Sequence, residues 1–262
     1  MPPRVPPSWF LVLWSGLAGL AVGSYLNVLV HRLPLGLSTV RPRSRCPACG
    51  APIRAADNIP VLSWLLLRGR CRDCGAAISP RYPLVELLTG VAFAGCVARF
   101  GFRPAALAAA VLAALLIALA AIDLDHFLLP DKLTLPGIAL GLAAQFLLPD
   151  GAPMAGLRGA LVGAGVLLLI AGLWELARGV EGMGLGDVKM LAMVGAFLGA
   201  GGAMVTLVFA TFAGSLIGLA LVARRGGDLQ TMLPFGVFLS AGGLVALFAG
   251  RPLVDAWLGL LR

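Results

Sequence analysis

Charged residues are scarce in this chain and make up 12% of its 262 residues. A soluble globular domain carries roughly 25% charged residues, so the composition excludes an ordinary water-soluble fold. Hydrophobic residues account for 60% of the sequence, and the mean hydropathy is +0.96. Together these values predict an all-α polytopic membrane protein that sits in the lipid bilayer.

The start of the chain lacks the pattern of a cleavable signal peptide. Residues 1–8 are punctuated by proline instead of forming a basic segment, and no small-residue cleavage site follows them. Residues 9–30 contain no charge, and a helix of this length spans about 30 Å of hydrocarbon. We therefore expect this run to remain in the protein as its first membrane helix.

Acidic residues are fewer than basic ones, and the basic residues are concentrated in one segment. The formal charge is +8, and nine of the 20 Lys and Arg residues lie in residues 32–81, where only Asp57 and Asp73 oppose them. The positive-inside rule explains this concentration better than nucleic-acid binding does. We therefore expect no nucleic-acid partner, a cytoplasmic loop over residues 35–81 and an N-terminus on the outside.

Cysteine is rare, and four of the five cysteines form two Cys-x-x-Cys pairs in this loop. The pairs are Cys46 with Cys49 and Cys71 with Cys74, separated by 21 residues and each followed by glycine. Four thiolates at this spacing are typical of a structural zinc site of the zinc-ribbon type, and two disulfides are the competing interpretation. A reducing cytoplasm disfavours disulfides, so we predict zinc in a closed site without a catalytic position. Cys96 lies in an apolar run and is interpreted as a small buried hydrophobic residue.

Seven further apolar runs follow, which predicts about eight transmembrane helices with one extramembrane loop between the first and the second. The runs cover residues 83–102, 104–122, 133–148, 159–177, 190–202, 203–222 and 233–248. Several are shorter than the roughly 20 residues that a span needs. Alternation from the cytoplasmic loop places three joins on the cytoplasmic side, and each contains Lys or Arg. These joins are residues 123–132, 178–189 and 224–228.

Two groups of acidic residues are candidates for chemistry. Asp187 ends a Gly-Leu-Gly-Asp segment at residues 184–187, whose glycines permit the close approach of another chain. The simpler alternative for Asp187 is a solvated side chain in a flexible loop. Asp123 and Asp125 form the second group, at the same predicted membrane face. Two carboxylates held close share one proton, so the ionised group activates water and the protonated group donates to a scissile carbonyl, as in an aspartyl protease.

Only one of Asp123 and Asp125 is expected to face Asp187, because residues two apart on a helix point about 200° away from each other. His126 is interpreted as a solvated residue in preference to a base or metal ligand. Glu86 and Glu175 lie in apolar runs. Pairing with the loop arginines is the simpler interpretation of these two glutamates, and a second substrate site is the alternative.

The motifs resemble those of one enzyme family over nearly the whole chain. Residues 23–34 resemble the first-helix signature of the bacterial prepilin peptidases, also called type IV leader peptidases, which are membrane aspartyl proteases and N-methyltransferases. The double Cys-x-x-Cys loop is also similar, with residues 58–64 inside it and residues 78–86 after it. Residues 184–187 resemble the Gly-x-Gly-Asp motif of intramembrane aspartyl proteases.

The resemblance implies which aspartates form the catalytic pair. The family's first catalytic Asp lies seven residues before the proline of a Leu-Pro-Asp segment, and this spacing corresponds to Asp123 and Pro130. Asp123 and Asp187 are therefore the expected catalytic residues, and Asp125 is the fallback. The chain departs from the family at Val237, where a second proline is common. We expect this departure to affect helix entry more than chemistry.

The resemblance further implies two reactions in the bacterial inner membrane. A precursor of a type IV pilin or a type II secretion pseudopilin would lose its short leader at the cytoplasmic face, and the new N-terminal amine would be methylated from S-adenosylmethionine. The intact zinc loop favours both activities. No glycine fingerprint of the Rossmann type marks a site for the methyl donor.

On this interpretation the chain divides into three parts. Residues 1–34 form the first transmembrane helix, residues 35–81 the zinc loop associated with methyl transfer, and residues 82–262 the peptidase core. A proton- or cation-coupled transporter and a non-enzymatic assembly factor are the alternatives. Acidic residues inside a membrane permit a transporter, but the sequence shows no inverted repeat of broken helices.

Overall fold

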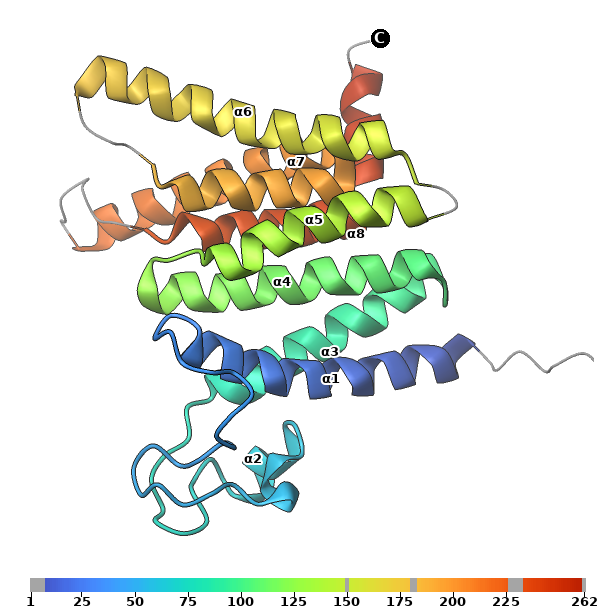
Figure 1. Ribbon diagram of the computed structural model, residues 1–262. Coiled ribbons are helices and arrows are strands. Elements are labelled where there is room, and N and C mark those ends of the chain that lie inside the picture. Colours follow the sequence, from blue (N-terminus) through green and yellow to red (C-terminus); the bar gives the residue numbers. More distant parts are fainter. Residues whose placement is uncertain (1–7, 149–150, 180–182, 226–232, 261–262) are drawn as a thin grey trace, which may run out of the picture. The chain divides into compact units, whose positions relative to one another are not determined.

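The computed structural model describes residues 8–148, 151–179, 183–225 and 233–260, and the regular elements of this part are helices (Figure 1). The helices are α1 (Ser8–Arg32), η1 (Ala55–Asn58), α2 (Leu62–Leu66), α3 (Arg81–Phe100), α4 (Pro104–His126), α5 (Asp131–Leu147), α6 (Pro153–Arg178), α7 (Leu185–Arg225) and α8 (Phe235–Leu260). Strand pairing in the described residues is confined to two isolated bridges, Arg45 with Pro52 and Arg70 with Ala77. The predicted all-α fold with one extramembrane loop is confirmed.

Five of the described helices are long and apolar enough to cross a membrane, namely α1, α3, α4, α6 and α7. Helix α5 has 17 residues, and the apolar part of α8 covers Phe235–Gly250. Helix α7 contains two of the predicted runs, and its backbone leaves the helical conformation at Gly199, where φ is 73°. Only glycine adopts such a φ without strain, so the helix breaks at this residue, inside the predicted run 190–202 and three residues before its predicted end. The count of eight transmembrane helices stays a prediction.

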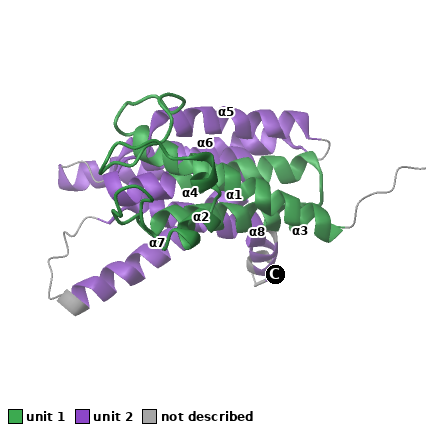
Figure 2. Ribbon diagram, turned by 90° about the horizontal axis from the view of Figure 1, so that it is seen from below, with its two compact units in different colours: residues 1–118 green, residues 119–262 purple. Residues whose placement is uncertain are grey.

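The chain divides into two compact units, with the boundary between Ala118 and Leu119 (Figure 2). The first unit is built on the packing of α1 against α3. The two helices touch through glycine, because a Cβ on Gly23 would lie 2.6 Å from the Glu86 Cα atom. A Cβ on Gly19 would lie 2.7 Å from the Thr89 carbonyl oxygen. Small residues at such crossings let membrane helices approach closely, and this contact brings the end of α1 to the start of α3.

The second unit is organised around α7, which packs against α5, α6 and α8. The crossing of α6 and α7 is again a contact of glycines. A Cβ on Gly159 would lie 2.1 Å from the Gly195 carbonyl oxygen, and a Cβ on Gly195 would lie 2.1 Å from the Gly159 carbonyl oxygen. This backbone contact fixes α7 within the unit and thereby positions its first turn, which carries Asp187.

Candidate active site and metal centre

Asp123 lies in the last turn of α4 and is buried, with 5% of its surface exposed. Its Oδ2 atom accepts a hydrogen bond of 3.2 Å from the backbone N–H of Val237, in the first turn of α8. Helix α4 ends three residues later, at His126, and Phe127 then takes a φ of 51°, in the left-handed region that a bulky side chain rarely adopts. The structure therefore seats the Asp123 carboxylate against the start of another helix of the second unit.

Asp187 lies in the first turn of α7 and is half-buried. It belongs to the same unit as Asp123. Asp125, in contrast, is exposed, as is His126. The structure thus separates the two candidates of the first acidic group, because Asp123 is buried and Asp125 is not.

Leu129 packs between the backbones that carry these functional groups. A Cβ on Gly186, next to Asp187, would lie 3.0 Å from the Leu129 Cβ atom. A Cβ on Gly236 would lie 2.9 Å from Leu129 Cδ2 and 2.8 Å from Asp123 Oδ2. Leu129 itself is only 7% exposed. Gly186 and Gly236 therefore lack side chains at the positions where a side chain would displace Leu129 or the Asp123 carboxylate.

An ion pair that the sequence did not predict connects two helix starts of this unit. The Lys189 Nζ atom pairs with the Asp131 carboxylate, so the first turn of α7 is tied to the first turn of α5. Lys189 is two residues from Asp187, and Asp131 follows directly after Pro130. The spacing of opposite charges at two predicted cytoplasmic joins was the available signal, but sequence alone does not show which charges meet.

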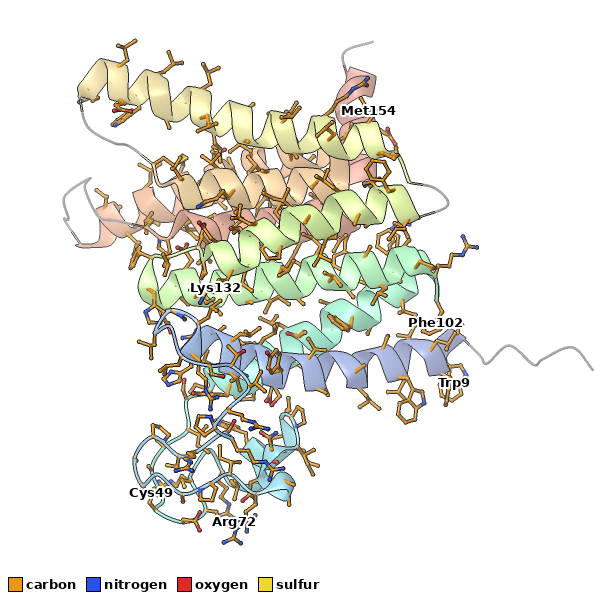
Figure 3. All side chains as sticks on the ribbon, viewed as in Figure 1. Trp9, Cys49, Arg72, Phe102, Lys132 and Met154 are labelled. Atoms are coloured by element: carbon orange, nitrogen blue, oxygen red, sulfur yellow. The ribbon has the colours of Figure 1, made fainter. Side chains whose placement is uncertain are left out.

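The four loop cysteines come together in the first unit. Their sulfur atoms all lie within 4.8 Å of one another, and Cys46 Sγ is 3.8 Å from Cys74 Sγ. All four are free thiols, which agrees with the zinc interpretation and not with two disulfides. A Zn–S distance of roughly 2.3 Å in a tetrahedron separates sulfurs by about 3.8 Å, so this donor set fits a zinc ion. Figure 3 shows Cys49 in the extramembrane loop, together with Arg72.

The two Cys-x-x-Cys segments have the same backbone geometry. The Cys46 N–H donates to the Ala51 carbonyl at 2.9 Å, and the Cys71 N–H donates to the Ala76 carbonyl at 2.8 Å. The glycine after each pair has a positive φ, which lets each turn close. The N–H groups of Cys49 and Ala48 lower the pKa of the Cys46 thiol to about 7, which favours the thiolate that a metal needs.

Side chains next to the cysteines brace the loop. Arg72 binds Asp57 through two nitrogens, with its Nη2 atom 2.6 Å from Asp57 Oδ1 and its Nε atom 2.9 Å from Oδ2. The Arg72 guanidinium lowers the pKa of the Asp57 carboxyl below its usual value. A fork-shaped arginine contact of this kind fixes geometry more strongly than a single charge pair. It holds residues 55–58 beside the second Cys-x-x-Cys pair.

Glu86 is buried, with 8% exposure, and its Oε2 atom accepts a hydrogen bond of 2.7 Å from the Val61 N–H. The simpler expectation of an arginine partner is therefore wrong for Glu86 in the described part of the chain. Val61 has a φ of 61°, which is strained for a β-branched residue. Nearby, the Trp64 side-chain N–H donates to the Ile78 carbonyl at 3.0 Å. Glu175 is exposed, so burial separates the two glutamates.

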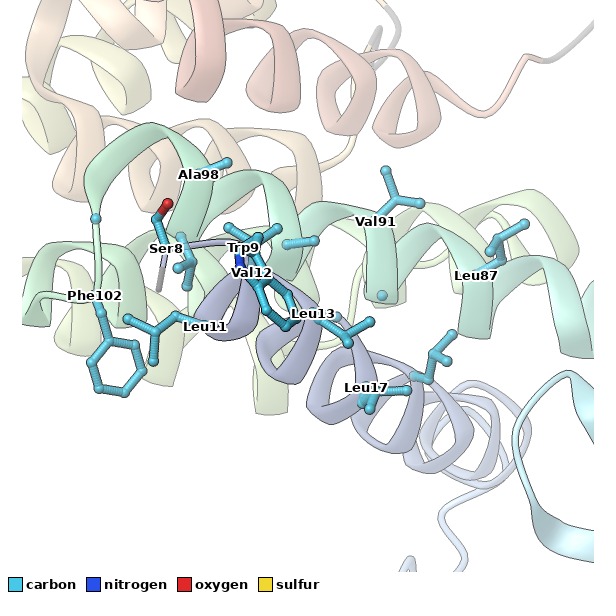
Figure 4. Close-up of a pocket in the computed structure, with 16 residues that line it drawn as sticks. Ser8, Trp9, Leu11, Val12, Leu13, Leu17, Leu87, Val91, Ala98 and Phe102 are labelled. Carbon is cyan, nitrogen blue, oxygen red and sulfur yellow. The ribbon is translucent and has the colours of Figure 1, made fainter. Parts of the chain in front are cut away.

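A groove of about 750 Å³ runs along α1 and α3 in the first unit (Figure 4). Its lining includes Trp9, Leu13, Leu17, Val91 and Phe102. It carries no titratable side chain, and Ser8 supplies its one side-chain hydroxyl. Such a lining matches the interior of a bilayer, so the groove is not a candidate for hydrolytic chemistry.

Known proteins resemble this chain over most of its length. Residues 17–100 match the bacterial peptidase A24 N-terminal domain, and residues 110–219 match the type IV leader peptidase family. A prepilin leader peptidase/N-methyltransferase of Burkholderia pseudomallei is 42% identical, over 94% of this chain and 88% of that protein. Proteins of the same name from Aeromonas salmonicida and Pseudomonas aeruginosa are each 40% identical, over 97% and 94% of this chain and 96% and 93% of their own lengths.

No solved structure matches the chain significantly. The sequence matches nevertheless cover both units, and the match to the peptidase family includes both Asp123 and Asp187. A membrane protein with this identity to full-length relatives shares their family. The chain therefore belongs to the type IV leader peptidase family.

Proposed function

We propose that this protein removes the leader from type IV prepilins or type II secretion pseudopilins and N-methylates the residue that the cut exposes. The observation that carries this proposal is the packing of Leu129 against Gly186, next to Asp187, and against Gly236, beside the Asp123 carboxylate, within the region that matches the peptidase family. The relatives' shared name, prepilin leader peptidase/N-methyltransferase, supports both reactions.

The aspartate pair supplies what peptide hydrolysis needs. One carboxylate takes a proton from water as the water oxygen attacks the scissile carbonyl carbon, while the other carboxyl group donates its proton to the carbonyl oxygen. Collapse of the tetrahedral intermediate breaks the C–N bond, and the leaving nitrogen takes a proton from the dyad. The products are a leader with a new carboxylate and a mature chain with a new amine.

The second reaction uses that new amine. S-adenosylmethionine would supply an electrophilic methyl group. The amine nitrogen would form the N–CH3 bond as the S–CH3 bond breaks, S-adenosylhomocysteine would leave, and the nitrogen would give up one proton. We assign the association with methyl transfer to residues 35–81, the peptidase core to residues 82–262 and the first transmembrane helix to residues 1–34. The packing of the helices divides the chain at a different place, between Ala118 and Leu119.

The zinc loop has a structural part in this scheme. Cys46, Cys49, Cys71 and Cys74 would hold one zinc ion with four thiolates, and a closed site of this kind offers no position for water or substrate. The concentration of arginine in residues 32–81 supports a loop on the cytoplasmic side. The dyad would then face the cytoplasm of a bacterial inner membrane, where precursor leaders begin.

Cleavage of a model prepilin by the purified, detergent-solubilised protein tests the proposal. We expect wild type and Asp125→Asn to release the leader, and Asp123→Asn and Asp187→Asn to fold without cutting. Cleavage by both of the latter variants would exclude the aspartyl mechanism. A transporter would instead lose ion flux in these variants, and an assembly factor would tolerate them.

A further inference from the structure

The first turn of α8 contacts the Asp123 carboxylate. The Val237 N–H donates to Asp123 Oδ2 at 3.2 Å, and Gly236 leaves the space that this carboxylate occupies. Resting on the peptidase function proposed above, we propose that Gly236 and Val237 position Asp123 and keep the negative charge of the dyad on it. Asp123 is then the base that activates water, and Asp187 is the proton donor.

The direction of the helices supports this division of roles. Asp123 stands in the last turn of α4, where the partial negative charge of a helix end opposes a carboxylate. The start of α8 brings the opposite partial charge and a backbone N–H to the same atom. A hydrogen bond donated to a carboxylate stabilises its ionised form, so α8 offsets the unfavourable end of α4.

The ionised form of Asp187 is stabilised by fewer contacts than that of Asp123. It also stands near the start of a helix, because it lies in the first turn of α7, and this position favours the anion to some degree. Its carboxyl group, however, has no hydrogen bond within the described residues, whereas that of Asp123 accepts one directly. When two close carboxyl groups share one proton, the proton is held by the group with less stabilisation of its anion.

Space around Asp123 is arranged for the same contact. A methyl group on Gly236 would lie 2.8 Å from Asp123 Oδ2, which is closer than a Cβ atom approaches an oxygen. The same methyl group would lie 2.9 Å from Leu129 Cδ2, and Leu129 also packs against Gly186 beside Asp187. Leu129 therefore cannot move away from this methyl group without disturbing its packing against Gly186, next to Asp187.

Other charges near the dyad do not replace this contact. At the start of α7 the cation is Lys189, which pairs with Asp131 of α5. On α4 itself the neighbouring titratable groups, Asp125 and His126, are exposed. The described part of α8 carries no charged residue from Phe235 to Gly250. The contribution of α8 to Asp123 is thus made by its backbone.

The test is the pH–rate profile of prepilin cleavage for wild type, Val237→Pro and Val237→Ala. Proline removes the N–H donor and is compatible with the first turn of a helix, whereas alanine removes most of the side chain and keeps the donor. We expect Val237→Pro to move the acidic limb of the profile to higher pH by about one unit, because the ionised base loses a charge-assisted hydrogen bond. Val237→Ala should move neither limb.

The acidic and alkaline limbs of the pH–rate profile distinguish which aspartate is the base. If Asp187 were the base, removal of the N–H would leave the acidic limb in place and move the alkaline limb upward, since Asp123 would then be the acid that must stay protonated. A shift of the alkaline limb, or no shift at all in folded Val237→Pro, overturns the inference. A wild-type protein that does not cut prepilin overturns the proposed function itself. This result differs from a shifted alkaline limb and from an unshifted profile, because both of those require an active wild type.

A second variant keeps the inference testable if Val237→Pro does not fold. Gly236→Ala favours the helix but places a methyl group against Asp123 Oδ2, so it should move the acidic limb in the same direction. Gly250→Ala, on the same helix, serves as the control. Its methyl group would meet only the Ala246 Cβ atom, at 3.8 Å, so we expect the wild-type pH–rate profile. Equal pH–rate profiles for Gly236→Ala and Gly250→Ala contradict the positioning role of Gly236.

Discussion

The Glu86 carboxylate holds the strained backbone of Val61 through a hydrogen bond of 2.7 Å from the Val61 N–H. This contact joins residues 58–64 of the loop to α3, one helix of the α1–α3 pair. The Asn27 side-chain amide donates to the Tyr82 carbonyl at 3.0 Å and joins α1 to the same region. The loop is therefore connected to the membrane helices by polar contacts as well as by the chain itself.

The first prediction concerns Glu86. Glu86→Ala leaves the Val61 N–H without its partner, and the loss of such a buried hydrogen bond costs about 1–3 kcal/mol. We expect prepilin to be cut at the wild-type rate and the mature product to be methylated several-fold less, because the proposed dyad lies in the other unit. Mass spectrometry of the mature N-terminus gives the ratio of methylated to unmethylated product. Glu175→Gln, at an exposed glutamate, is the matched control, and equal methylation by both variants contradicts the prediction.

The second prediction concerns Lys189 and Asp131. The pair is partly exposed, with 28% and 57% of the two side chains accessible, so its effect on stability should stay below about 1 kcal/mol. Its effect on cleavage should be larger, because Lys189 is two residues from Asp187. We expect Lys189→Ala and Asp131→Ala each to lower kcat/KM several-fold, and the double variant to fall no further.

A double-mutant cycle of kcat/KM measures this coupling. Lys132→Ala provides a control at a neighbouring exposed lysine, which Figure 3 labels. Strictly additive losses in the double variant would show that the two side chains act separately.

The third prediction concerns the metal. Cys49→Ser, or treatment with a strong chelator, should reduce bound zinc below one ion per chain, since the site depends on all four thiolates. Methylation should fall with the zinc content while cleavage persists. Metal analysis and the two product assays on the same sample check this, with Cys96→Ala as the control because Cys96 is buried away from the four-cysteine cluster. Zinc retained at the wild-type level by Cys49→Ser rules out the four-thiolate site.

The fourth prediction concerns the crossing of α6 and α7. Gly159→Ala places a methyl group where the Gly195 carbonyl oxygen lies, and overpacking of this kind costs about 1–3 kcal/mol. We expect a lower midpoint of thermal unfolding in detergent and a parallel loss of cleavage, because α7 carries Asp187. Gly165→Ala, on the same helix, meets nothing within 4 Å and should unfold like wild type. A Gly159→Ala variant with wild-type stability would show that the two backbones are not in contact.

The sequence determined the class of this protein and the chemistry available to it. Long uncharged runs have no stable place in water, so they alone predict membrane helices. Each Cys-x-x-Cys pair is local in the sequence, and turns with the same hydrogen bond shape both pairs, so the spacing alone marks the four candidate zinc ligands. The Gly-Leu-Gly-Asp segment and the acidic group at residues 123–125 likewise mark candidate catalytic side chains before any packing is known.

The tertiary structure decided which of these residues meet. Helix geometry alone does not say whether Asp123 or Asp125 faces Asp187, and the resemblance to the family pointed to Asp123. The packing of α8 shows that Asp123 is the buried one and that the Val237 N–H reaches it. The departure at Val237 therefore touches Asp123 of the proposed dyad as well as the entry to α8. The Lys189–Asp131 pair and the Val61 contact of Glu86 were likewise shown only by the tertiary structure. Each depends on helices that are distant in the chain, and periodicity and composition carry no information about which faces of such helices come into contact.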